Sequence, residues 1–215
     1  MRLYKLTDQN GQTKNGTQWS EGSTHTASGK GELCSEGWIH AYTDPLLAVF
    51  LNPIHANFPA PQLWEAEGEV GKEDHGLKVG VQSLRTIAQM PLPKVSLEQR
   101  VRFAILCALE VHRTPGFAAW AHKWLTGEDR SVKTAEAAEA AVAEAAVAAE
   151  AAVAAAAVAR VAACVADAVV VRAVEGAWAA AAVVVRAVEE AWARTKKPFH
   201  LAALAASAME EDHVV

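Results

Sequence analysis

The stretch GWIHAYTDPLLAVF, residues Gly37–Phe50, decides the fold class because it runs from an extended segment through a turn into a helix. Large and small side chains alternate from Trp38 to Tyr42, as they do in a β-strand. Asp44 and Pro45 then fit the N-cap and the first position of a helix, and apolar residues follow them. A strand leading directly into a helix predicts an α+β protein, with a small N-terminal domain of a mixed sheet and helices.

Other segments agree with this class. Strands are expected over Arg2–Thr7, Pro61–Val70 and Leu77–Val81, with a short helix as the alternative for the residues after Val81. The helix that begins at Pro45 is expected to end before the Asn52–Pro53 pair. Ser96 and Gln99 form a capping box, which predicts a helix there, and a second helix is expected over Phe117–Leu125. We take residues 1–133 as the α+β domain.

The C-terminal third is an internal repeat rich in alanine and valine. VVVRAVEGAWA at Val169–Ala179 recurs as VVVRAVEEAWA at Val183–Ala193, and an earlier set of valines, Val142 to Val158, is spaced by five and six residues. These spacings predict helices with apolar stripes over 134–197, followed by a short helix and tail over 198–215. An apolar stripe on a helix is expected to pack against another surface and not to stay exposed to solvent. The heptad-spaced stripe of the second repeat, called the seam below, is therefore a candidate interaction surface. Its residues are Val171, Val174, Trp178, Val185, Val188 and Trp192.

The charge is unevenly distributed. Residues 1–133 hold 14 acidic and 14 basic residues, and residues 134–215 hold 11 and 6, so the tail carries the whole net charge of −5. A neutral domain and an acidic tail argue against non-specific nucleic-acid binding and against binding to anionic membranes. Charged residues interrupt the apolar tail well before the ~18 residues that a membrane span needs. The three cysteines are far apart, as expected of reduced thiols in a cytoplasmic protein.

The sequence contains few motifs that are typical of catalytic or metal-binding sites. No phosphate-binding glycine loop or nucleophile motif occurs, and no two of the eight histidines have metal-ligand spacing, so no metal is expected. The alternative is a metal site assembled in space from His40, His55 and a carboxylate. Trp38, His40 and Tyr42 alternate on one face of the strand, before a helix N-terminus that could receive an anion. The competing interpretation is that Trp38 and Tyr42 are core residues and His40 bonds locally.

The pattern of Gly37–Ala48, with Leu3–Lys5 and the strand Leu63–Glu67, resembles a family of uncharacterised bacteriophage and prophage proteins that carry a GFHAC-DPL type motif. The resemblance covers about residues 1–125, and WLTGEDRS at Trp124–Ser131 before an alanine-rich tail is similar to members of that group. It implies a phage accessory protein without an assigned activity.

More remotely, the order of elements is similar to the ADP-ribosyltransferase fold. That resemblance implies NAD as the cofactor, Tyr42 stacked on nicotinamide, and Glu65 or Glu67 as the acid, with Tyr4 and Lys5 standing where the family has a first-strand histidine. The ligand-pocket candidates are therefore Tyr4, Lys5, Trp38, His40, Tyr42, Asp44, Glu65 and Glu67. The competing interpretation is that Glu65 and Glu67 are ordinary charged residues on a solvent-exposed face of the strand.

Three functions are left open. The first is a phage accessory protein that binds a host protein or complex without a cofactor, for example as an inhibitor of a host defence complex. The second is an ADP-ribosyltransferase-like enzyme or a nucleotide-binding pseudoenzyme, for which NAD would be the ligand. The third is a structural component that forms homo-oligomers through its helical tail.

Overall fold

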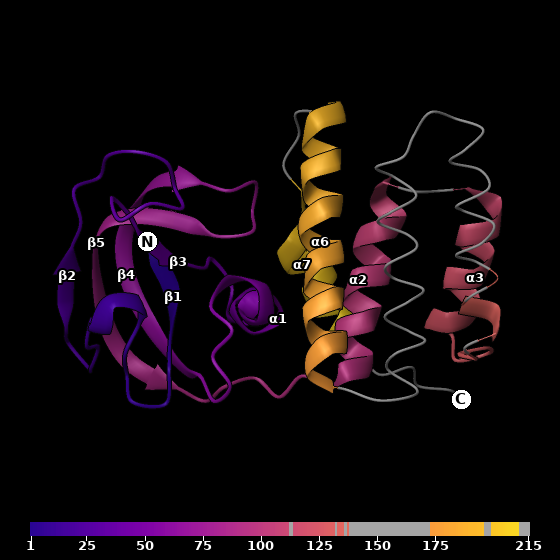
Figure 1. The fold of residues 1–215 in the computed structure, drawn as a ribbon, viewed down its shortest axis with the longest axis horizontal. Coiled ribbons are helices and arrows are strands. Elements are labelled where there is room, and N and C mark those ends of the chain that lie inside the picture. Colours follow the sequence, from indigo (N-terminus) through magenta and orange to yellow (C-terminus); the bar gives the residue numbers. More distant parts are fainter. Residues whose placement is uncertain (112–113, 132, 136, 138–172, 196–198, 211–215) are drawn as a thin grey trace. The chain divides into compact units, whose positions relative to one another are not determined.

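The computed structural model describes residues 1–111, 114–131, 133–135, 137, 173–195 and 199–210 (Figure 1). By its internal contacts the chain separates into two compact units, Met1–Lys94 with Pro198–Ala202 and Val95–Lys197 with Ala203–Val215. The division falls after Lys94, earlier than residue 133, because helix α2 (Leu97–Val111) packs along α6 (Ala173–Thr195). The elements give an α+β protein, as the sequence predicted.

The first unit contains a five-stranded sheet. Its long strands are β1 (Arg2–Thr7), β4 (Gln62–Glu73) and β5 (Val79–Met90), and its short strands are β2 (Thr24–Thr26) and β3 (Ile39–Ala41). The strand order is β1-β4-β5-β2, and β3 pairs with another part of β5. Every strand pair in the described residues is antiparallel, which corrects the expected mixed sheet. Helix α1 (Pro45–His55) leads from β3 to β4, but those two strands are not neighbours, so no parallel crossover forms.

The sheet closes on itself through one pair of tyrosines. The amide of Tyr4 in β1 donates to the carbonyl of Tyr42 at 2.8 Å, and the amide of Tyr42 donates back at 2.9 Å. Because β3 also pairs with β5, the strands β1, β4, β5 and β3 form a ring. Ring closure hides backbone edges that would otherwise be free to pair.

The ring encloses an apolar core. Alternation along β1 turns Leu3, Lys5 and Thr7 to the inside, and Trp64, which lies opposite Lys5, donates its indole N–H to the Thr7 hydroxyl at 3.1 Å. Lys5 is thus a charged residue on a buried face. The apolar members of the cluster are Leu3, Trp19, Ala41, Ala66, Val79, Val81 and Leu84.

Helix α1 begins as the sequence predicts but ends later. The Asp44 carboxylate accepts from the amides of Leu46 and Leu47 at 2.8 and 3.4 Å, and Pro45 occupies the first turn. The helix continues through Pro53 to His55, because a proline at the start of the last turn removes only one internal hydrogen bond. The Asn52 side chain then holds the departing chain through two bonds to the backbone of Phe58.

Strands β4 and β5 form a long hairpin. Its turn is closed by the amide of Asp74, which donates to the carbonyl of Lys78 at 3.0 Å, and His75 and Gly76 adopt positive φ. The strand expected over Leu77–Val81 therefore extends to Met90, and no short helix follows it. Pairing with β4 along this length overrides the weak helical preference of those residues.

The second unit is helical in its described part and contains α2, α3 (Pro115–Leu125) and α6, together with most of α7 (Leu201–Met209). The capping box of α2 is confirmed, since Ser96 and Gln99 exchange hydrogen bonds between their amides and side chains. None of the helices in the described ranges is long and apolar enough to cross a membrane.

The predicted seam falls partly in α6. Val188 is buried, Val185 and Trp192 are half-buried, and Trp178 is 50% exposed. Val174 also lies in α6. Val171 and the valine stripe over 142–158 lie outside the described residues. The seam is therefore used in part by the chain's own packing, and its role as an interaction surface stays a prediction.

Candidate functional site

The candidate site lies on the outer face of β3. Ile39 and Ala41 turn to the core of the ring, so Trp38, His40 and Tyr42 share the opposite face, as the alternation predicted. Their contacts divide them into two groups. Trp38 and His40 hold the loop that precedes the strand, and Tyr42 contacts helix α1.

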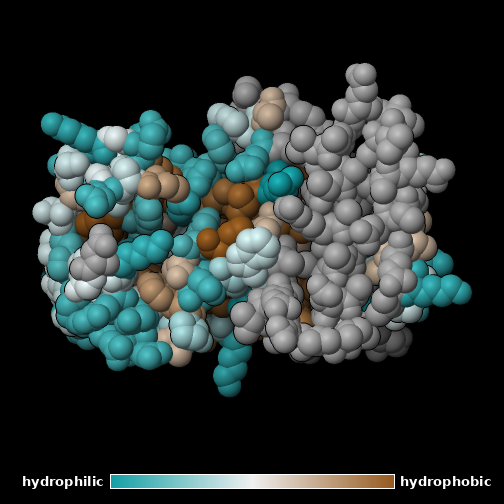
Figure 2. Space-filling model, viewed as in Figure 1, coloured by the Kyte–Doolittle hydropathy of each residue, from teal (hydrophilic) through white to brown (hydrophobic). Residues whose placement is uncertain are grey.

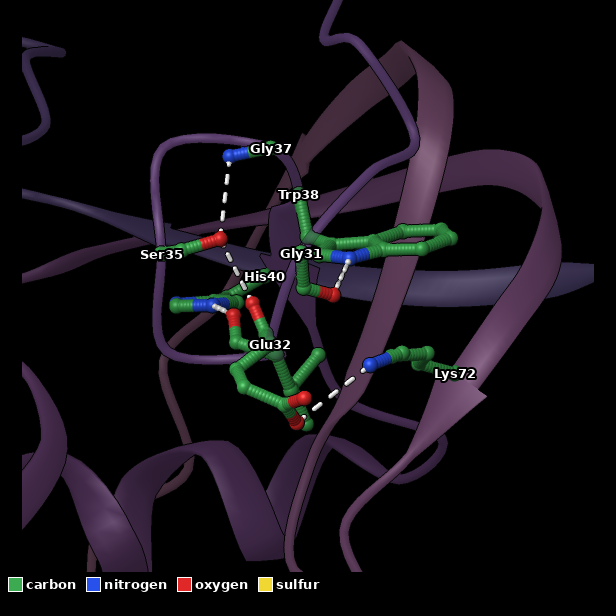
Figure 3. A network of polar contacts seen from close by, with 8 residues as sticks. Gly31, Glu32, Ser35, Gly37, Trp38, His40 and Lys72 are labelled. Carbon is green, nitrogen blue, oxygen red and sulfur yellow. Dashed lines mark hydrogen bonds and ion pairs between the residues drawn. The ribbon is translucent and has the colours of Figure 1, made fainter.

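The Gly29–Gly37 loop is fixed by bonds within itself and to β3. Its two ends meet where the amide of Gly29 donates to the carbonyl of Gly37 at 2.8 Å. The Trp38 indole donates to the carbonyl of Gly31 at 3.1 Å, and Nε2 of His40 bonds the carbonyl of Leu33 (Figure 3). Because a carbonyl only accepts, Nε2 of His40 carries a proton. The loop is thus held at two points along its length.

Ser35 forms two further hydrogen bonds within the loop. The Ser35 hydroxyl donates to the carbonyl of Glu32 at 2.6 Å and accepts from the amide of Gly37 at 3.3 Å. The Glu32 carboxylate pairs with Lys72 of β4 at 3.4 Å (Figure 3). This ion pair is exposed on the Glu32 side and adds little stability by itself.

Glycines in the sheet make room for the loop. A Cβ on Gly71 would lie 2.5 Å from the Trp38 ring, and a Cβ on Gly80 would lie 2.4 Å from the Leu33 side chain. At Gly37 a Cβ would lie 1.7 Å from the carbonyl oxygen of Lys30. The loop and the Trp38 ring therefore lie directly against backbone, and no larger residue fits at these three positions without movement.

Tyr42 is a core residue in contact with α1. Its hydroxyl lies 3.2 Å from Nδ1 of His55, and the two rings stack at 6.0 Å. Burial raises the pKa of Tyr42 well above its usual value. Burial, and to a lesser extent the Lys78 cation, lower the pKa of His55 to about 4, against an opposing effect of Asp74. Both side chains are therefore neutral near pH 7.

Lys5 is the most unusual of the candidates. Its ammonium is buried, donates to the carbonyl of His40 at 2.7 Å, and lies 5.3 Å from the centre of the Trp19 ring. Burial lowers the pKa of Lys5 to about 8. The His25 ring also makes an edge contact with Trp19, with 4.5 Å between the ring centres. Lys5 thus joins β1, β3 and the segment that carries Trp19.

The remaining candidates have structural roles. Asp44 caps α1, and the backbone of Tyr4 closes the ring. Glu65 pairs with Arg2 at 2.7 Å and Glu67 pairs with Arg85 at 3.3 Å on the outer face of the sheet. These ion pairs agree with the interpretation that Glu65 and Glu67 lie on a solvent-exposed face of the strand.

Several residues that build the site were not singled out from the sequence. Trp19, Gly71 and Gly80 make or permit its long-range contacts, whereas His55, which the sequence offered only as an alternative metal ligand, contacts Tyr42. A usable signal exists for the glycines, since glycine inside a strand marks a close approach of other groups. Trp19 and His55 are distant from their partners along the chain, and no local pattern indicates those contacts.

The outer side of the loop is polar and exposed. Lys30, Glu32, Cys34, Ser35 and Glu36 are exposed, and Cys34 is a free thiol. Hydrophilic residues also predominate on the visible face of the sheet unit (Figure 2). Within the described ranges, no group of three or more His, Cys, Asp or Glu side chains is placed to hold a metal ion. The side of the loop that faces solvent is therefore polar and charged.

The comparisons with known proteins give no relative. No family model, no curated protein and no solved structure matches the chain.

The His55 contact predicts a loss of stability in acid. Its pKa is about 4 in the folded chain and about 6.5 when unfolded. Between these values the unfolded chain binds more protons, so stability falls as the pH drops from 6.5 to 4. The full loss from this group is about 3 kcal/mol.

Urea denaturation at pH 7 and pH 4 measures this loss. A His55→Gln variant keeps a polar partner for Tyr42 but does not titrate, so its loss should be smaller by about 3 kcal/mol. An equal loss in the variant and the wild type would show that His55 does not titrate in this way.

Proposed function

We propose that the chain is a bacteriophage accessory protein that acts by binding a host protein, with the Gly29–Gly37 loop as its contact surface. Inhibition of a host defence complex is the role that the resemblance to phage and prophage proteins implies. The main support for a binding function is that the side chains of Trp38 and His40 both form hydrogen bonds to carbonyl groups of this loop and hold it in place.

The physical argument rests on preorganisation. A loop that is ordered before it meets a partner loses less conformational entropy on binding. Loops held on a rigid scaffold are where binding residues concentrate. Here Trp38 and His40 hold the inner part of the loop, whereas Lys30, Cys34 and Glu36 are exposed and their side chains form no hydrogen bond or ion pair within the described residues. Those three side chains are free to meet a partner.

Capture from host lysate tests this proposal. The full chain carrying Lys30→Ala, Cys34→Ala and Glu36→Ala together should lose the captured protein, with affinity at least about thirtyfold weaker. A control carrying Glu21→Ala and Lys94→Ala, which changes exposed residues of the same unit outside the loop, should capture as the wild type does.

A third arm tests the helical surface. Trp178→Ala removes the half-exposed ring of α6 and should leave capture unchanged. Loss of the partner in this arm, with capture kept by the loop variant, would place the contact on α6 instead. Capture that survives both changes would contradict the proposal.

A further inference from the structure

The last residues of strand β5 have a neighbouring strand on one side only. From Val79 to Thr86 both sides of β5 are covered, because β3 and β2 pair with it opposite β4, and the amide of Thr86 donates to the carbonyl of Ser23 at 3.0 Å. Within the described part of the chain, the backbone of Ile87–Met90 bonds to no segment besides β4. Ile87–Met90 is therefore an open edge of the sheet, which continues the row that β2 begins.

Exposed apolar side chains gather at this open edge. The register between β4 and β5 passes over Ile87, so this residue is a bulge without a partner in β4. The Ile87 side chain is 38% exposed, and Leu92, just beyond the strand, is 36% exposed. Among the described residues, only Met1 and Trp178 are large apolar residues of similar or greater exposure. The open edge thus combines free backbone groups with exposed apolar surface.

The open edge also lacks the charges that usually protect such edges. Charged side chains on an exposed edge oppose its pairing with another chain. Strand β4 provides a comparison, since beyond Gly68 the described residues place no strand on its side away from β5. That stretch of β4 carries Glu69, Lys72 and Glu73. Strand β5, in contrast, has no charged residue from Thr86 to Pro93.

The residues around the open edge favour a second copy of this chain as its partner. The amide of Gly22 donates to the carbonyl of Thr86 at 3.0 Å, so the turn that holds the exposed Glu21 lies at the Thr86 end of the edge. Antiparallel pairing of two copies brings the chain that follows Met90 of the partner copy to this end, and with it the exposed Lys94 of the partner copy. By two-fold symmetry this opposite-charge pair occurs twice.

Two further charges and two prolines limit this pairing. Arg85 also lies at the Thr86 end, but its guanidinium already pairs with Glu67 at 3.3 Å. Pro91 and Pro93 have no amide to donate, so the edge ends after Met90. Two copies can therefore pair over a short length, and the sheet does not extend beyond them.

We propose that two copies of the chain pair antiparallel through Ile87–Met90 and bury Ile87 and Leu92 between them. Each copy contributes about eight residues, whereas a standard interface has about 20–30 residues on each side. The dimer is therefore transient, with a dissociation constant on the order of 0.1 mM. This surface is separate from the Gly29–Gly37 loop and does not depend on the function proposed for it.

Sedimentation equilibrium of the full chain, from about 10 μM to about 1 mM, tests the proposal. The average mass should rise with concentration from 22.8 kDa towards twice that value. Ile87→Lys should weaken association at least about tenfold, because it places a charge in the buried strip between the copies. Trp178→Lys changes the exposed ring of α6 instead, and should associate as the wild type does.

A charge exchange tests the antiparallel arrangement. Glu21→Lys should weaken association about threefold, because it then faces Lys94 of the partner copy. The double variant Glu21→Lys with Lys94→Glu should return to the wild-type constant. A double variant as weak as Glu21→Lys alone would show that the two residues do not meet in the dimer, and would overturn the proposed arrangement.

The wild-type measurement is decisive even where a variant does not fold. A chain that stays monomeric up to about 1 mM would contradict the proposal. So would association that Ile87→Lys leaves unchanged, and association that Trp178→Lys abolishes would place the contact on the helical tail instead.

Discussion

A Lys5→Met variant should be more stable than the wild type at pH 7, by about 2 kcal/mol. The Lys5 ammonium is buried and has one hydrogen-bond acceptor, the carbonyl of His40, besides the face of Trp19. Its lowered pKa, about 8, corresponds to a penalty of about 3 kcal/mol for the charged form. Methionine has a similar shape and no charge, so the variant avoids this penalty. It also loses the hydrogen bond to the carbonyl of His40, which lowers its stability by about 1 kcal/mol and leaves a net gain of about 2 kcal/mol.

The pH dependence of the wild type provides a second readout. The pKa of Lys5 is about 8 in the folded chain and 10.5 in the unfolded chain, so the unfolded chain binds more protons between these values. Stability should therefore rise from pH 8 to pH 10.5 by about 3 kcal/mol from this group, and Lys5→Met should lack that rise.

Urea denaturation of both chains measures these effects. Lys14→Met, at an exposed lysine, should change the free energy of unfolding by less than about 0.5 kcal/mol. A Lys5→Met variant that is less stable than the wild type at pH 7 would show that the ammonium holds the fold together.

Gly37→Ala should disrupt the Gly29–Gly37 loop and, under the proposed function, abolish capture of a partner from host lysate. The added Cβ would lie 1.7 Å from the carbonyl oxygen of Lys30, a distance that no contact tolerates, so one side of the loop has to move. Overpacking of this kind costs about 1–3 kcal/mol. The bonds of the loop to Trp38 and His40 should weaken with it.

The matched control is Gly116→Ala, where a Cβ would meet nothing within 4 Å and the backbone is helical. That change should be neutral or stabilising by up to about 1 kcal/mol. Denaturation and lysate capture measure both variants. A Gly37→Ala chain that keeps its stability and its partner would contradict the role given to the loop.

Local signals in the sequence predicted the elements well. Asp44 caps α1, Ser96 and Gln99 form their box, and Trp64 and Ala66 are buried while Glu67 is exposed. Each of these depends on residues within a few positions of one another. Helix α1 passed the expected stop at Pro53, because neighbouring contacts decide whether one lost hydrogen bond ends a helix.

The long-range features could not be predicted in this way. The ring closes through Tyr4 and Tyr42, and Lys5 reaches His40 and Trp19, across separations that no periodicity encodes. Trp38, His40 and Tyr42 were placed correctly on one face. What they contact depends on the path of the loop and of α1, which only the folded chain specifies.

Hydrogen exchange over residues 28–38, measured residue by residue without any ligand, tests the central claim most directly. The amides of Gly29, Ser35 and Gly37 and the Trp38 indole all donate within the loop or to it. They should exchange at least about 100-fold more slowly than in an unstructured peptide. Exchange at the rates of an unstructured peptide would show that the loop is not ordered before it meets a partner. That result would contradict the proposal that the loop is a preorganised contact surface.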